Sequence, residues 1–123
     1  MEQYDPEQDL AAEEWLDLDE QERMILVEDY HRWHRSRMPN VEAHAVVHTI
    51  VENQLALPEP VVVATFARLR AEGLGRHDAV HAIGSVLSAH LNSLLQDPTS
   101  QDPSLERYHE ALHGLSASKW RAG

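Results

Sequence analysis

The sequence predicts an all-α protein, an antiparallel helical bundle of about four main helices plus a short C-terminal helix. Apolar residues recur at helical spacing, and no window shows sustained period-2 alternation. Prolines at positions 39, 58, 60 and 103 divide the chain into helix-length segments joined by short loops. Short loops favour antiparallel packing of neighbouring helices. The 123 residues suit one domain with one core.

The first main helix is predicted over about residues 20–35. The stretch Asp19-Glu20-Gln21-Glu22 has the pattern of a capping box, and its acids favour the positive end of the helix dipole. Pro39 restricts the residue before it and ends this helix. Asn40 is the expected cap of a second helix over about residues 41–56.

The later helices are delimited by proline and glycine. Pro60 suits a first helical position and opens a helix that ends at about residue 72, where Gly73 is the expected C-cap. A fourth helix runs from its cap Gly75 to about residue 96. After a loop, a short fifth helix is expected over about residues 104–115, started by Pro103.

Acidic residues are concentrated at the N-terminal end. The formal net charge is −11, and residues 1–29 hold twelve acids and one base. In the rest of the chain the acidic and basic residues are equal in number. We therefore divide the single domain 1–123 into an acidic leader (1–17), a helical core (18–96), and a loop with the C-terminal helix and tail (97–123). The leader is a candidate docking segment for a protein partner.

Composition excludes several classes of function. The chain has no positive surplus for binding phosphates, so no nucleic acid is expected as a partner. No apolar run is long enough to span a membrane, and the acidic N-terminus is unlike a signal peptide. We expect a cytoplasmic protein. The absence of cysteine excludes disulfides, thiolate nucleophiles and iron–sulfur clusters.

Histidine is abundant, with nine copies, and it recurs at a spacing of four residues. On helical projections of residues 41–56 and 76–96, His44 and His48 lie on the apolar side of one helix, and His77 and His81 on that of the other. Glu52 lies at the margin of the same side, one turn after His48.

Two imidazoles one helical turn apart lie about 6 Å from each other, so both can bind one ion. Two facing helices then provide four nitrogen ligands, which is how bundles build metal sites. The candidate ligands of a divalent metal such as zinc or iron are His44, His48, Glu52, His77 and His81. Asp78 is a further candidate ligand or supporting residue.

A second hypothesis needs no metal. The histidines form a buried hydrogen-bond network with Gln54 and Glu52, in a non-catalytic module that binds a protein partner through its acidic segment. The sequence leaves enzyme status open, because it has no phosphate-binding loop, nucleophile elbow or His-Glu-x-x-His motif. An open metal site would make hydrolysis the natural reaction, with Glu52 as the base.

The other histidines fit these patterns less well. His109 and His113 flank an apolar helix face beside acids, which favours a solvated margin. His31 and His34 lie among apolar positions of the first helix, which favours partial burial over metal ligation.

The paired histidine blocks support a resemblance over about residues 30–95. The chain resembles an uncharacterised bacterial family of small helical proteins, classed as a domain of unknown function. The residues that carry the likeness are His44-Ala-Val-Val-His48, Val51-Glu52-Asn53-Gln54 and Arg76-His77-Asp78-Ala79-Val80-His81. The resemblance implies an all-α fold in which these blocks lie together, and it implies no activity.

Overall fold

The structure is a computed structural model that describes residues 1–33, 41–96 and 105–122. These residues form helices and no strands, which confirms the all-α prediction. The helices are α1 (Ala12–Asp17), α2 (Glu20–Trp33), α3 (Val41–Ala56), α4 (Pro60–Ala71), α5 (Arg76–Gln96), α6 (Glu106–Gly114) and α7 (Ala117–Ala122).

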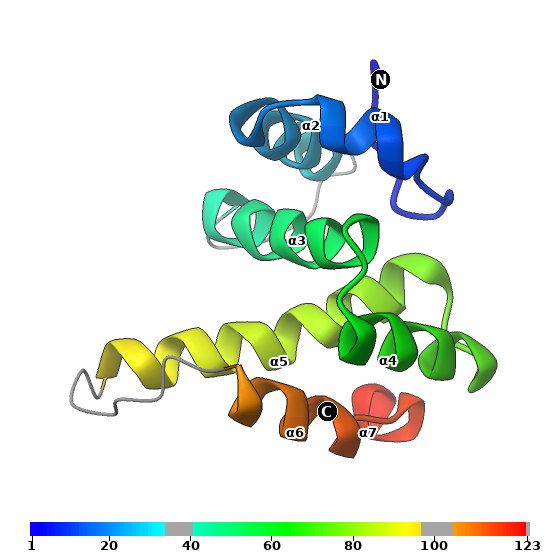
Figure 1. Cartoon of the computed structure of the whole chain (residues 1–123), viewed down its shortest axis with the longest axis vertical. Coiled ribbons are helices and arrows are strands. Elements are labelled where there is room, and N and C mark those ends of the chain that lie inside the picture. Colours follow the sequence, from blue (N-terminus) through cyan, green and yellow to red (C-terminus); the bar gives the residue numbers. More distant parts are fainter. Residues whose placement is uncertain (34–40, 97–104, 123) are drawn as a thin grey trace.

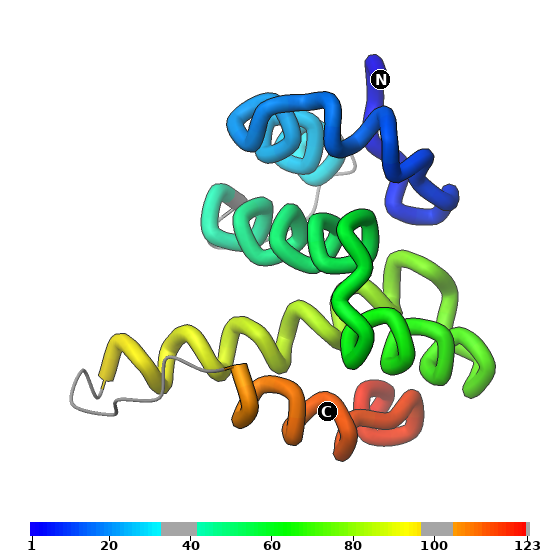
Figure 2. Tube along the Cα trace, in the orientation of Figure 1, coloured from blue at the N-terminus to red at the C-terminus, as the bar shows by residue number. Residues whose placement is uncertain are grey.

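The helices are stacked in layers (Figure 1). In this view α1 and α2 lie above α3, α5 and α4 lie beneath it, and α6 and α7 form the opposite end. The contacts follow the same order, since α3 packs against both α2 and α5, and α5 against both α4 and α6. The tube in Figure 2 shows α5 as the longest helix, passing under α3 and continuing beyond it. The central helix α3 therefore has a neighbour on each side.

Most helix-end signals act as predicted. The Glu22 amide donates to Asp19 Oδ1 (2.8 Å), and the Asp19 amide donates to Glu22 Oε1 (3.3 Å), which completes the capping box. Gly73 has a φ of 102° and follows α4, where the Leu74 amide donates to the Leu69 carbonyl. These are the marks of a Schellman C-cap, which glycine adopts without a steric penalty.

Other predicted boundaries lie outside the described residues, namely the cap at Asn40, the breaks at Pro39 and Pro103, and the last predicted turn of the first helix. Two short helices were not predicted. Both α1 and α7 have six residues, which is too short for a clear periodic pattern.

The acidic leader is folded onto the rest of the chain, which its polar composition did not predict. Tyr4 and Trp15 are buried and form an apolar cluster with Val27 and Ala45. The Trp15 indole N–H donates to Asn53 Oδ1 on α3 (2.9 Å). A few apolar anchors are therefore sufficient to attach a segment whose acids remain mostly exposed. Docking of a protein partner through these acids stays a prediction.

The helices α3 and α5 approach each other closely at Gly84. A Cβ atom added to this glycine would lie 3.1 Å from Val47 Cγ1. The absence of a side chain at this position therefore allows the neighbouring helix to approach. Among the described residues, no helix combines the length and apolar character needed to cross a membrane.

Replacing Gly84 should therefore destabilise the fold by overpacking. We expect Gly84→Leu to lower the free energy of unfolding by about 2 kcal/mol in urea denaturation. Gly114→Leu is the matched control, because nothing lies within 4 Å of a Cβ at that position. Equal losses in the two variants would contradict close packing at Gly84.

Candidate metal centre

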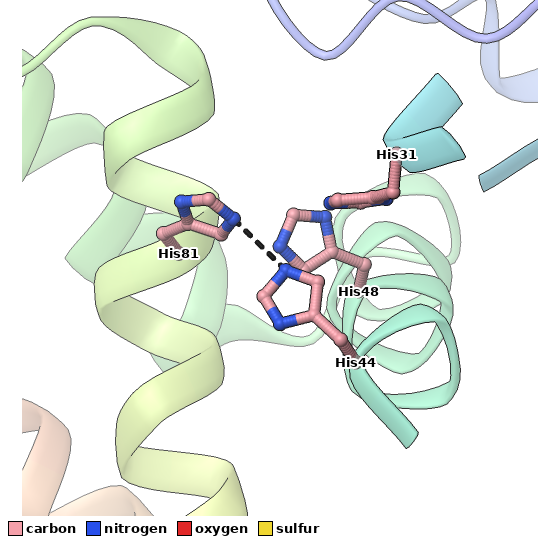
Figure 3. A group of neighbouring side chains, drawn as sticks. All are labelled: His31, His44, His48 and His81. Atoms are coloured by element: carbon pink, nitrogen blue, oxygen red, sulfur yellow. Dashed lines mark hydrogen bonds between the residues drawn. The ribbon is translucent and has the colours of Figure 1, made fainter. Parts of the chain in front are cut away.

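Four histidines from three helices converge at one place, where His31 and His48 are buried and His44 and His81 are partly buried. His31 comes from the last turn of α2, His44 and His48 from successive turns of α3, and His81 from α5. Each offers one ring nitrogen, and these four atoms all lie within 4.8 Å of one another. Figure 3 shows His81 facing His44 and His48 from the opposite helix, with His31 beside His48. The ring centroids of His31 and His48 are 4.8 Å apart.

The two pairs predicted from the sequence do meet across the helix interface. His44 Nε2 and His81 Nε2 are 3.0 Å apart, a contact between α3 and α5 (Figure 3). The ring centroids of His48 and His81 are 4.4 Å apart. The inward direction of these side chains follows from the four-residue spacing on each helix, because positions one turn apart share a face.

His31 is held in a single tautomer. Its Nδ1 lies 2.7 Å from the Val27 carbonyl one turn earlier on α2. A carbonyl only accepts, so Nδ1 carries the proton, and in the neutral ring Nε2 has the lone pair. A backbone acceptor at one ring nitrogen is the usual way in which proteins orient a metal-ligating histidine.

His48 is the most unusual of the four. Its side chain is 1% exposed, and neither ring nitrogen has a hydrogen-bond partner among the described residues. A neutral imidazole has one donor and one acceptor, and burying both without partners is costly. Its surroundings are the imidazole rings of His31, His44, His77 and His81.

The environment keeps His44, His48 and His81 neutral near pH 7. Burial, together with the neighbouring imidazoles, lowers the pKa of His44 to about 4 and the pKa of His81 to about 3. The same causes lower the pKa of the more deeply buried His48 further. Neutral imidazoles have a free lone pair, and this is the form that binds metals.

His77, predicted as a ligand, lies at the edge of the cluster. Its ring centroid is 4.2 Å from that of His81 and 5.6 Å from that of His48. Its nitrogens are not among the four that lie within 4.8 Å of one another. The His77 ring also lies edge to face with Tyr30, and the two ring centroids are 5.4 Å apart.

Glu52, the predicted carboxylate ligand, is buried but turned to different partners. Arg76 donates to both of its oxygens at 2.8 Å, and the Tyr4 hydroxyl donates to one of them. Arg76 also donates to the Pro6 carbonyl (3.0 Å). Glu52 is thus the acceptor of an ion pair that joins α3, α5 and the N-terminal segment.

The other predicted supporting residues are not part of the four-histidine group. Gln54 accepts a hydrogen bond from Tyr108 (2.9 Å), and Asp78 is exposed. His109 is partly buried, with Nε2 3.5 Å from Glu59, and His113 is exposed, so only His113 fits the predicted solvated margin. His34 lies outside the described residues.

Sequence reasoning missed His31. We predicted partial burial for it, whereas it is fully buried and belongs to the cluster. It lies on a helix without a second described histidine one turn away, so the spacing signal did not apply. The nearest sequence signal was its position among apolar residues of the first helix.

Comparison with known proteins adds no assignment. The chain matches no family model, no curated protein and no solved structure. The resemblance to a bacterial family of unknown function therefore stays a prediction.

The lowered pKa values predict that acid destabilises the metal-free protein. An unfolded histidine titrates near its ordinary pKa of about 6.5, whereas His44 and His81 accept protons in the native state only near pH 4 and 3. The unfolded chain therefore binds more protons below pH 6.5, and stability falls as the pH falls from there towards 4.

Urea denaturation of metal-free protein between pH 7 and 4.5 measures this dependence. We expect His48→Phe to flatten it, because one titrating group is removed. The matched control His113→Phe alters an exposed side chain and should leave the slope unchanged. Identical slopes in wild type and His48→Phe would contradict the argument.

The buried ion pair predicts that Glu52 acts on stability. Glu52→Gln removes the charge opposite Arg76 and should lower the free energy of unfolding by about 3–5 kcal/mol in urea denaturation. Arg32→Met, which breaks an exposed pair with Glu28, should change it by less than about 1 kcal/mol. A Glu52→Gln variant as stable as wild type would refute this role.

Proposed function

We propose that this protein binds one divalent transition-metal ion through His31, His44, His48 and His81. The observation that carries the proposal is the convergence of four imidazole nitrogens, one from each residue, within 4.8 Å of one another. Tetrahedral ligands with metal–nitrogen bonds near 2.05 Å lie about 3.4 Å apart. Small rotations of the side chains would bring the four atoms from their present separations to that distance.

The chemistry of the donors selects a class of metal. All four are imidazole nitrogens, and Glu52, the one buried carboxylate among the described residues, is engaged by Arg76. Imidazole suits zinc, copper, nickel and iron, whereas magnesium and calcium prefer oxygen ligands. Zinc and ferrous iron, expected from the sequence, both belong to the favoured class.

The alternative of a core network includes one hydrogen bond between clustered histidines, between His44 Nε2 and His81 Nε2 (3.0 Å), but it lacks the other partners predicted for it. Gln54 pairs with Tyr108 and Glu52 with Arg76, so neither supplies the hydrogen bonds that such a network needs. His48 is left with two unpartnered nitrogens at full burial. A bound metal ion would provide a partner for one of these two nitrogens. It would also explain why the core contains imidazoles whose burial without partners is unfavourable.

Metal loading of protein purified without a histidine tag tests the proposal. We expect one ion per chain by elemental analysis after gel filtration, and a raised melting temperature with added zinc, because an ion that binds only the native state stabilises it. His44→Gln/His48→Gln should weaken metal binding at least 100-fold by isothermal titration calorimetry.

A matched pair controls for histidine content. His109→Gln/His113→Gln removes two histidines at the same spacing from α6 and should leave the metal affinity unchanged. Absence of a bound ion, together with melting temperatures that do not respond to zinc, copper, nickel, cobalt or ferrous iron, would refute the proposal.

A further inference from the structure

His77 has an arrangement that the four-histidine site does not explain. Its Nε2 atom is buried and has no hydrogen-bond partner among the described residues. Its ring packs against His81 and also lies near His48 and His31, with a centroid distance of 6.1 Å to His31. A buried polar atom beside the cluster, yet outside the four-atom set, points to a polar group between His77 and the ion.

The charge beside the other nitrogen indicates which tautomer His77 adopts. Nδ1 lies 3.8 Å from Glu7 Oε1, a half-exposed carboxylate of the N-terminal segment. This distance is too long for a direct hydrogen bond, but the negative charge favours the proton on Nδ1. Nε2 then keeps its lone pair and acts as an acceptor.

We propose that the metal ion carries an exchangeable oxygen ligand, water or hydroxide, that donates a hydrogen bond to His77 Nε2. The proposal rests on the proposed function, because the ligand needs the ion. An O–H group matches the acceptor that His77 presents and would satisfy its buried nitrogen. His77 is then a contact of the bound ligand and not a fifth imidazole on the metal.

The position of His77 outside the four-atom group leaves room for an oxygen ligand between this residue and the ion. His77 lies outside the group whose nitrogens are all within 4.8 Å. An oxygen ligand bridges a longer gap, because it adds a bond of about 2 Å and a hydrogen bond of about 2.8 Å.

The consequence concerns the class of site. Four protein ligands with no further position make a closed, structural site, whereas an exchangeable position allows the ion to activate water or bind a small molecule. The proposal therefore assigns an open site, with its exchangeable position facing His77.

Copper(II) serves as the probe, because its spectra report both nitrogen and oxygen ligands. With the full-length, copper-loaded protein in deuterated water, we expect pulsed electron paramagnetic resonance to detect coordinated exchangeable deuterons. Azide should displace this water, and the azide-to-copper charge-transfer band should rise to a plateau as azide is added. A one-to-one copper complex that shows neither signal would overturn the inference and leave the proposed function intact.

His77→Phe tests the contact, because it keeps a ring and removes the acceptor. Loss of one hydrogen bond to the bound water should make azide bind about tenfold more tightly than in wild type, with one copper still bound. His90→Phe is the matched control on the same helix, since His90 lies beside Tyr108, away from the cluster. Circular dichroism checks that both variants fold.

Each result decides between defined alternatives. Unchanged azide affinity in His77→Phe would show that His77 does not contact the ligand and would overturn the proposal. Loss of one nitrogen coupling and a 100-fold fall in copper affinity would make His77 a direct ligand and would also overturn it. If His77→Phe does not fold, the deuteron and azide measurements on wild type still decide whether the site is open.

Discussion

The buried ion pair between Glu52 and Arg76 joins the parts of the chain that surround the histidines. Glu52 lies one turn after His48 on α3, and Arg76 directly precedes His77 on α5. Their two hydrogen bonds of 2.8 Å therefore set the register between the helices that bring His48 and His81 together. Such a pair contributes little net stability but is costly to break, so it specifies one arrangement of the two helices.

Close packing at Gly84 also determines how near α3 lies to α5. Gly84 is one turn beyond His81 in the approximate register of α5, and it lets Val47 of α3 come near the helix backbone. Without this approach the imidazoles of the two helices would be held further apart. The glycine and the ion pair thus both position α3 against α5, close to the histidines of these two helices.

The sequence was sufficient to predict the main helices and the two pairs His44/His48 and His77/His81, because helix caps and four-residue spacing are local. It was not sufficient for His31, whose position depends on how α2 packs on α3. It was equally insufficient for Glu52, since a carboxylate one turn from a histidine looks the same whether it faces a metal or an arginine 24 positions away. Long-range pairing decides between these roles.

The same long-range packing brings acids of the N-terminal segment close to the histidine-bearing helix α5. From the sequence, the acids near the N-terminus belong to a segment separate from the histidines. In the folded chain Glu7 lies beside His77, and Asp9 lies 3.6 Å from Arg76. A divalent ion bound as proposed would keep its full charge, because neutral imidazoles do not compensate it and Arg76 already neutralises the buried Glu52. The nearby exposed acids would then supply part of the countercharge, and their field would attract cations towards this side of the protein.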